Sequence, residues 1–123
     1  MRLSPPEQLN AGHAIDQFSC GVPDLDDWLQ RRALANQASG ASRTYVACIE
    51  NRVIAYYAIA SGAISAADTT GRFRRNMSEP VPVAVLGRLA VDASAQGLGL
   101  GRALFRDAAL RLEKTSSKLN SAA

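Results

Sequence analysis

The sequence predicts a single α/β domain that contains an antiparallel hairpin, a further strand and two helices. Three observations predict this fold. Apolar residues recur at helical spacing between Leu25 and Ala33. Two runs rich in β-forming residues follow each other within residues 44–63. A glycine-rich turn then joins a further apolar run to a stretch of helix-forming residues. The length of 123 residues fits one such domain.

A short strand around Leu9 and then an amphipathic helix are expected first. The helix starts near Pro23 and Asp24, because proline is tolerated in the first turn and an acidic side chain favours the positive helix end. It is expected to run to about residue 38 and to end at Gly40. Its buried stripe is formed by Leu25, Trp28, Leu29 and Ala33.

Residues 44–50 and 53–63 are expected to pair as an antiparallel hairpin around a turn at Asn51-Arg52. The second strand is long and mostly apolar, which predicts cover on both of its faces. Residues 65–80 combine turn residues with a basic run at 72–77. This segment is either a surface loop or a loop that contacts phosphate, and the pattern leaves both open.

A further strand is expected over residues 83–91, and a helix over residues 102–112. The apolar face of that helix is expected to comprise Leu104, Phe105, Ala108, Ala109 and Leu112, with Arg106 and Arg111 facing water. Residues 113–123 are polar and small without periodicity. The domain is therefore expected to span residues 1–112, and residues 113–123 to form a disordered or non-native tail.

Composition excludes several classes of protein. No apolar run is long enough to cross a bilayer, and the N-terminus lacks the apolar core of a signal peptide, so we expect a cytoplasmic protein without a membrane partner. Cys20, Cys48 and the single histidine, His13, show no ligand spacing, which predicts no metal site.

Positive charge is concentrated in the second part of the chain. Residues 1–50 carry six acidic and four basic side chains, whereas residues 51–123 carry five acidic and ten basic ones. Twelve of the fourteen basic residues are arginine, which suits bidentate phosphate contacts. A polyanionic partner and a solvated basic surface both fit this pattern.

The most informative motif is the turn Gln96-Gly97-Leu98-Gly99-Leu100-Gly101. A glycine-rich turn between a strand and a helix leaves backbone N–H groups free at the positive end of the helix dipole, which suits phosphate. Gly99 and Gly101 allow positive φ and close approach of a ligand. The three glycines are spaced G-x-G-x-G rather than the G-x-G-x-x-G of the dinucleotide fingerprint, and the Gly-Lys-Ser/Thr of a P-loop is absent.

Gln96, Gly99 and Gly101 resemble the acyl-CoA pyrophosphate loop of the GCN5-related N-acetyltransferase (GNAT) superfamily, and residues 86–92 look like its fourth strand. Four upstream blocks, at residues 18–21, 25–29, 42–46 and 56–60, occur in the same order in one branch. That branch is the GNAT toxins of bacterial type II toxin–antitoxin pairs. The resemblance covers about residues 9–112. It implies the GNAT acyl-CoA-binding fold, a mixed, mostly antiparallel central sheet with flanking helices.

The resemblance implies a cofactor site for acetyl-CoA, with no metal. Backbone N–H groups of residues 97–102 would bind the pyrophosphate, and the main chain of the fourth strand would pair with the pantetheine. The implied cofactor-binding residues are Leu89, Ala90, Val91, Gln96, Gly97, Leu98, Gly99, Leu100, Gly101 and Arg102. The family's C-terminal strand, helix and closing strands, with the tyrosine that protonates the thiolate, find no counterpart here. Tyr45, Tyr56 and Tyr57 do not match that motif.

The implied function is an acetyl-CoA-dependent N-acetyltransferase that acetylates the amino group of aminoacyl-tRNA and so blocks translation. The implied partners are aminoacyl-tRNA and a ribbon-helix-helix antitoxin. An unpaired edge on the fourth strand predicts a homodimer or a strand-exchanged oligomer, and the unmatched part of the fold predicts weak or no catalysis. Two alternatives stay open: a non-catalytic GNAT remnant that binds an antitoxin or nucleic acid, and a GNAT that acts on another small amine.

Overall fold

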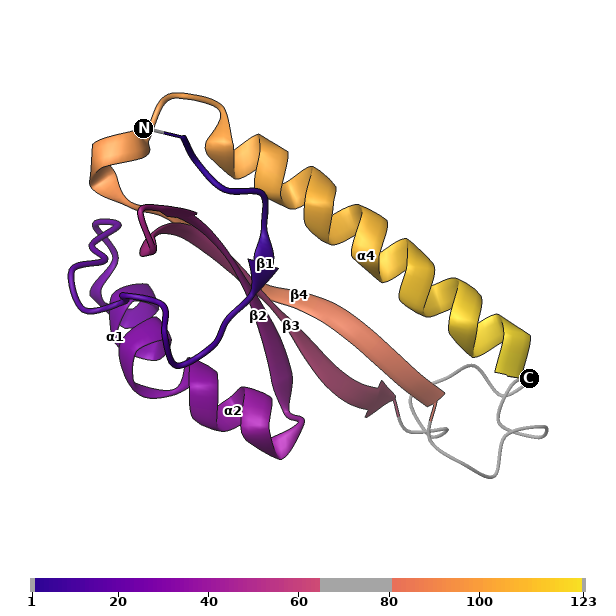
Figure 1. Ribbon diagram of the computed structural model, residues 1–123. Coiled ribbons are helices and arrows are strands. Elements are labelled where there is room, and N and C mark those ends of the chain that lie inside the picture. Colours follow the sequence, from indigo (N-terminus) through magenta and orange to yellow (C-terminus); the bar gives the residue numbers. More distant parts are fainter. Residues whose placement is uncertain (1, 65–80, 123) are drawn as a thin grey trace.

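The computed structural model describes residues 2–64 and 81–122 of the chain (Figure 1). The basic run expected within residues 65–80 lies outside the described residues. In chain order, the elements are β1 (Glu7–Gln8), α1 (Pro23–Arg31), α2 (Ala33–Ser39), β2 (Ser42–Ile49), β3 (Arg52–Ile64), β4 (Val81–Val91), the 3-10 helix η2 (Ala93–Ala95) and α4 (Leu100–Ala122).

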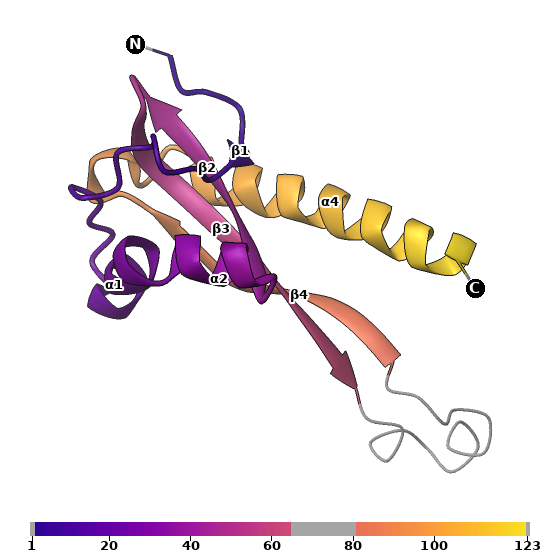
Figure 2. The same cartoon turned by 60° about the horizontal axis from the view of Figure 1, so that its bottom comes forward.

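The four described strands form one sheet in the order β1-β2-β3-β4, and every neighbouring pair is antiparallel. Helices α1 and α2 cover one face of the sheet, and α4 covers the other, as Figures 1 and 2 both show. The predicted α/β fold, hairpin and long central strand are confirmed. Among the described strands, β4 has a neighbour on one side only.

The core has two halves that meet at β3. Tyr56 and Tyr57 are adjacent and fully buried, and they point to opposite faces because side chains alternate along a strand. Tyr56 packs against Phe18 and Trp28 on the α1 side, at centroid distances of 5.4 and 6.0 Å. Tyr57 stacks on Tyr45 on the α4 side at 5.2 Å. The prediction that this strand is covered on both faces is therefore confirmed.

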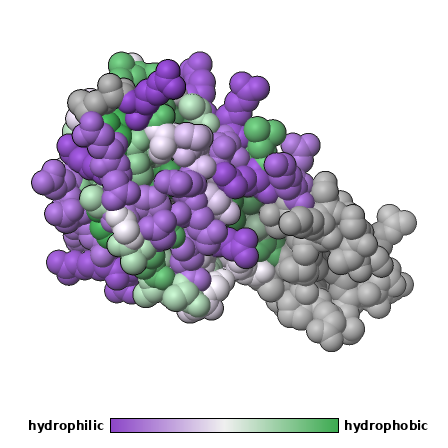
Figure 3. All heavy atoms as spheres, in the orientation of Figure 1, coloured by the Kyte–Doolittle hydropathy of each residue, from purple (hydrophilic) through white to green (hydrophobic). Residues whose placement is uncertain are grey.

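Several large apolar side chains are exposed among the described residues, Leu98 and Phe105 most of all. On the face shown in Figure 3, hydrophilic residues cover most of the surface and hydrophobic ones appear between them. Among the described residues, no helix combines the length and the apolar character that crossing a bilayer requires.

The first predicted helix is in fact two helices. Arg32 ends α1 by donating its N–H to the Trp28 carbonyl, and its own carbonyl accepts from Asn36 at the start of α2. The expectation of a single helix is wrong. The sequence has no proline or glycine near residue 32 that would mark the break, so we attribute the position of the break to tertiary packing. The expected end at Gly40 is confirmed, with a left-handed φ of 84°.

The β2–β3 turn lies one residue earlier than expected. Glu50 and Asn51 have φ values of 50° and 70°, whereas Arg52 already pairs with Ile49. A two-residue turn with positive φ at both central positions matches the twist of the strands it joins. Asparagine tolerates a positive φ better than most residues with a side chain. Asn51 was expected as the first residue of the turn but is the second.

Helix α4 extends beyond its expected end at residue 112. The backbone stays helical through Ala122, where a disordered tail had been expected, and no glycine or proline interrupts residues 102–122. The expected apolar face is confirmed at Leu104 and Ala108, which are buried, but it is wrong at Phe105, which is 59% exposed. Ala109 is exposed as well, because the sheet contacts only a narrow stripe of the helix.

Candidate functional site

The glycine-rich turn lies where β4 ends and α4 begins. Gly97 and Gly99 have φ values of 84° and 83°, a conformation that residues with a side chain rarely adopt. A Cβ added at either position would meet no atom within 4 Å. Glycine is therefore required at both positions by backbone conformation, and the space beside them is open.

The turn presents a row of free amides. The first hydrogen bond of α4 joins the Ala103 N–H to the Gly99 carbonyl at 3.1 Å. Within the part of the chain that the structure describes, the backbone N–H groups of residues 97–102 donate to no acceptor. They lie at the positive end of a 23-residue helix, and Leu98 beside them is 77% exposed. This arrangement suits an anion.

Gly101 lies inside α4 and does not use the positive φ that glycine allows. A Cβ here would lie 3.8 Å from the Leu89 side chain and 3.9 Å from that of Val91. The glycine thus lets the first turn of α4 approach β4 closely, which also fixes where the free amides lie.

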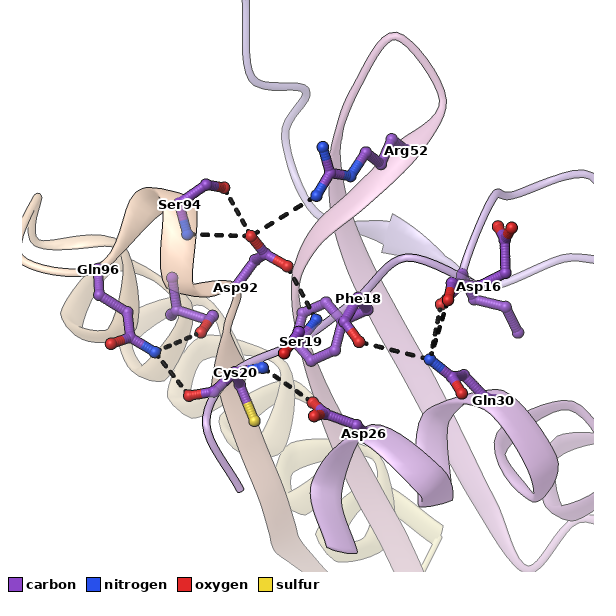
Figure 4. Close-up of polar contacts among 12 residues, drawn as sticks. Asp16, Phe18, Ser19, Cys20, Asp26, Gln30, Arg52, Asp92, Ser94 and Gln96 are labelled. Atoms are coloured by element: carbon purple, nitrogen blue, oxygen red, sulfur yellow. Dashed lines mark hydrogen bonds and ion pairs between the residues drawn. The ribbon is translucent and has the colours of Figure 1, made fainter. Parts of the chain in front are cut away.

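Gln96 turns its side chain back into the protein. Its Nε2 donates to the carbonyl of Cys20 at 2.8 Å and to the carbonyl of Val91 at 2.9 Å (Figure 4). Both N–H groups of the Gln96 side chain are therefore used inside the chain, although Gln96 is one of the predicted cofactor-binding residues.

Asp92 is a buried carboxylate that the sequence reasoning did not single out. It accepts from the Ser19 N–H at 2.9 Å, from the Ser94 N–H at 3.0 Å and from the Ser94 hydroxyl at 2.6 Å, and Arg52 lies 3.7 Å away. Burial alone raises the pKa of Asp92, but these hydrogen bonds and the Arg52 charge outweigh it and hold the pKa below the usual value. An aspartate two residues before a serine, directly after a strand, was the available signal.

The predicted cofactor-binding residues of β4 lie beside this turn. Leu89, Ala90 and Val91 pair with β3 on one side, and no described strand lies on their other side. Leu89 and Val91 pack with the α4 half of the core, and Ala90 with the α1 half. The main chain at the end of β4 therefore has a side that is open to a further extended partner.

A bulge precedes these residues in β4. Ala58 pairs with Arg88 whereas Ile59 pairs with Leu86, so Gly87 is the extra residue. Bulges redirect a strand and are frequent beside active sites. The glycine inside an apolar strand was the sequence signal for this bulge, and the sequence reasoning missed it.

A groove of about 630 Å³ lies between α1, α2 and the bulged part of β4. The Arg88 guanidinium stacks over the Trp28 ring with its carbon 4.5 Å from the centroid. The groove is lined by Asp24, Asp27, Trp28, Arg31, Arg32, Asn36 and Arg88. The Trp28 ring is buried between Tyr56 and Arg88, so the polar groups of the groove are its three arginines, two aspartates and Asn36. The arginines suit contacts with phosphates.

The two buried tyrosines use their hydroxyl groups inside the fold. Tyr56 donates to the Leu25 carbonyl at 2.7 Å, and Tyr57 donates to the Asp107 carboxylate at 2.5 Å. Burial raises the pKa of both phenols. Neither hydroxyl is placed to protonate a leaving group at the turn.

The fold brings Glu7, His13 and Cys48 together, although their positions in the sequence show no ligand spacing. Their side-chain ligand atoms all lie within 4.8 Å of one another. The Asn10 N–H donates to His13 Nδ1 at 3.0 Å, so Nε2 carries the proton and donates to Glu7 at 2.9 Å. Burial, and then Glu7, raises the pKa of the Cys48 thiol to about 11. A protonated Nε2 and a protonated thiol fit a hydrogen-bonded tether of β1 better than a metal site.

The sequence profile of the acetyltransferase (GNAT) family matches residues 11–118. The chain belongs to this family. The fold and family that the glycine-rich turn predicted are therefore confirmed. A tRNA-acetylating toxin of Mycobacterium tuberculosis (strain ATCC 25618 / H37Rv) is 51% identical over 105 residues. These residues are 85% of this GNAT chain but only 63% of that toxin's length.

Solved structures of toxins share this GNAT fold. A structure of AtaT complexed with acetyl-methionyl-tRNAfMet is 25% identical, with a TM-score of 0.76, and the match covers 96% of this chain and 73% of that one. A structure of AtaTR bound with AcCoA is 26% identical, with a TM-score of 0.74, and the match covers 94% of this chain and 68% of that one. The predicted resemblance to the toxin branch is confirmed by these relatives.

Proposed function

We propose that this chain is an acetyl-CoA-dependent N-acetyltransferase of the toxin type, which acetylates the amino group of aminoacyl-tRNA and so blocks translation. The observation that carries the proposal is the row of free amides at residues 97–102, at the N-terminus of α4 and beside the open side of β4. Its similarity to a tRNA-acetylating toxin supports the substrate.

In this proposal, acetyl-CoA supplies the acetyl group as a thioester. The N–H groups of Gly97, Leu98, Gly99, Leu100, Gly101 and Arg102 bind its diphosphate, because helix N-termini favour anions. The main chain of Leu89, Ala90 and Val91 pairs with the pantetheine arm as an added strand would. A backbone N–H of the same strand would polarise the thioester carbonyl. The neutral amine would attack the carbonyl carbon, so that the new C–N bond forms as the C–S bond breaks. Coenzyme A would leave as a thiolate and take up a proton, while the nitrogen of the new amide would lose one to solvent.

The aminoacyl-tRNA approaches from the α1–α2 side. The groove beside Trp28 supplies Arg31, Arg32 and Arg88 for the phosphates of the acceptor end. Because β4 forms one wall of this groove and also leads into the amide-rich turn, the two substrates would meet across β4. Since aminoacyl-tRNA is a cytoplasmic molecule, we place the protein in the cytoplasm.

The proposed protein partner is a ribbon-helix-helix antitoxin. A similar structure shows the AtaT Y144F mutant toxin bound to the C-terminus of the antitoxin AtaR and acetyl-CoA, at 25% identity and a TM-score of 0.75. Co-expression of the chain with a candidate ribbon-helix-helix protein, followed by size-exclusion chromatography, tests this partner.

A second candidate function is non-catalytic binding of an antitoxin or nucleic acid. The observation in its favour is that Tyr56 and Tyr57 use their hydroxyls inside the fold, so among the described residues neither buried tyrosine supplies a general acid near the turn. Loss of a general acid costs roughly 10²–10⁴-fold in rate. We therefore expect tight binding of acetyl-CoA but slow transfer by these 123 residues.

The test is transfer of label from radiolabelled acetyl-CoA to a mixture of aminoacylated tRNAs. Wild-type chain is compared with Arg88→Gln, which removes the guanidinium from the groove, and with deacylated tRNA as substrate. We expect label on aminoacyl-tRNA only, reduced about tenfold or more by Arg88→Gln. Acetyl-CoA binding without any transfer would favour the non-catalytic candidate, and absence of acetyl-CoA binding would contradict both the cofactor and the enzyme assignments.

A further inference from the structure

The segment Ser19–Cys20, which precedes α1, is fastened across the end of β4. The Ser19 N–H donates to Asp92, and the Ser19 carbonyl accepts from the Ala93 N–H at 2.8 Å. The Cys20 carbonyl accepts from Gln96. Figure 4 shows these contacts converging from the start of α1 and from the end of β4. Residues that lie more than seventy positions apart in the chain are thus joined beside the glycine-rich turn.

Asp92 and Gln96 stand at the two ends of the link between β4 and the turn. Asp92 closes the start of η2 through Ser94 and also binds Arg52. Gln96 holds two carbonyls with one amide group, immediately before Gly97. Beyond Gln96, the described N–H groups of residues 97–102 make no hydrogen bond that would fix the turn by itself. On the α4 side, the Ala103 N–H and the contact of Gly101 with β4 hold the turn. On the β4 side, Asp92 and Gln96 are the side chains that hold it.

We propose that Asp92 and Gln96 are positioning residues, which hold the glycine-rich turn against Ser19–Cys20 so that its amides converge before an anion binds. This inference rests on the proposed function. A turn with two glycines at positive φ has many conformations when unanchored, and ordering it on binding would weaken affinity. Holding it in advance removes that cost. The same anchors link the turn to the start of α1, which forms one wall of the arginine groove.

The chain offers a matched control for Gln96. Gln30 also uses its Nε2 to hold carbonyls of the segment before α1, those of Ile15, Asp16 and Phe18, at 3.3–3.4 Å. Gln30 does not touch the glycine-rich turn. Gln96→Met and Gln30→Met both remove a side-chain amide while keeping side-chain length, so they separate positioning of the turn from general support of the lead-in segment.

The first measurement is calorimetric affinity for acetyl-CoA, with inorganic pyrophosphate as competitor. We expect Gln96→Met to weaken binding of both by about fivefold to thirtyfold, with Gln30→Met within about twofold of wild type. Thermal unfolding of both variants shows whether each is folded at the temperature of the titration. Equal affinity losses in the two variants, or no loss in Gln96→Met, would overturn the proposal.

The second measurement needs no ligand. Backbone amide relaxation by NMR reports the order of residues 97–101 in each variant. We expect lower order parameters in Gln96→Met than in wild type, and unchanged values in Gln30→Met. If wild-type chain binds no acetyl-CoA but Gln96→Met still loosens the turn, the positioning role stands and the proposed function fails. If the turn is equally ordered in all three proteins, the positioning role fails whatever the affinities are.

Discussion

At the scale of single residues, three glycines of one turn carry different constraints. Gly97 and Gly99 hold a positive φ with open space beside them, whereas Gly101 is helical and lies close to Leu89 and Val91. The sequence pattern could show that glycine recurs, but it could not show which of two reasons applied. That distinction depends on where α4 begins, because a glycine before the first helical residue is free to take positive φ and a glycine inside the helix is not.

Gly99→Glu tests the anion site at the residue just before α4. We expect binding of acetyl-CoA to weaken by at least about a hundredfold, because a carboxylate would stand beside the free amides and repel the diphosphate. Gly40→Glu is the control, since Gly40 has a φ of 84° and equally open space. Both changes carry similar backbone strain. Calorimetry that shows equal affinity for the two variants would remove the turn from consideration.

Asp92→Asn tests the buried carboxylate through pH. The pKa of Asp92 is lower in the folded chain than the ordinary value of about 3.9, so its stabilisation is fully present above about pH 4 and is lost as pH falls through the folded pKa. We expect the variant to be less stable at pH 7 by about 1–3 kcal/mol in urea unfolding. That deficit should shrink toward pH 3.

The exposed Asp16→Asn serves as the control for this carboxylate and should change stability by no more than about 0.5 kcal/mol at either pH. A deficit of Asp92→Asn that stays constant from pH 7 to pH 3 would show that the charge of Asp92 does not stabilise the fold.

At the scale of elements, the sequence predicted which segments pair and missed where several of them end. The hairpin and the long β3 follow from runs of β-forming residues, and the end of α2 follows from Gly40. The break at Arg32 and the bulge at Gly87 depend on packing against the sheet, which local pattern does not contain. The hydrogen bonds that join Asp92 and Gln96 to Ser19 and Cys20 could not be predicted from the sequence, because these partners lie more than seventy positions away.

The close approach of α4 to β4 gives a prediction at Gly101. Alanine should fit, since its Cβ would make ordinary contacts at 3.8–3.9 Å and alanine favours a helix by up to about 1 kcal/mol over glycine. Phenylalanine should force the elements apart and destabilise the fold by about 1–3 kcal/mol. Ala109→Phe, at an exposed position of the same helix, should change stability by less than about 0.5 kcal/mol.

Chemical denaturation measures these Gly101 variants. A Gly101→Phe protein as stable as Ala109→Phe would show that α4 does not need the close contact with β4.

At the scale of the whole molecule, we expect the side of β4 without a described strand neighbour to determine whether two copies of the chain associate. Val85 on this strand is 52% exposed, and an unpaired strand edge attracts another strand. We expect a homodimer or strand-exchanged oligomer in light scattering after size-exclusion chromatography, with Val85→Lys shifting the population toward monomer. A clean wild-type monomer at high concentration would contradict this prediction.

Membership of the GNAT family is also a property of the whole chain. The order of four upstream blocks and the glycine-rich turn was enough to predict the GNAT family, and the profile match over residues 11–118 confirms it. The free amides of the turn were predicted as well, whereas the groove arginines and the contacts of Ser19–Cys20 depend on segments that lie far apart in the sequence. Side-chain pattern predicts elements, but the direction of a backbone N–H is a property of the folded chain.

The central claim is that the amides of residues 97–102 bind the diphosphate of coenzyme A. Its most direct test is an NMR titration of isotopically labelled chain with coenzyme A, following backbone amide resonances. We expect the largest, saturable chemical-shift changes at these residues, with smaller changes along Leu89–Val91 and little change in α2. Saturable shifts that leave residues 97–102 unmoved, or no saturable shifts at all, would contradict it.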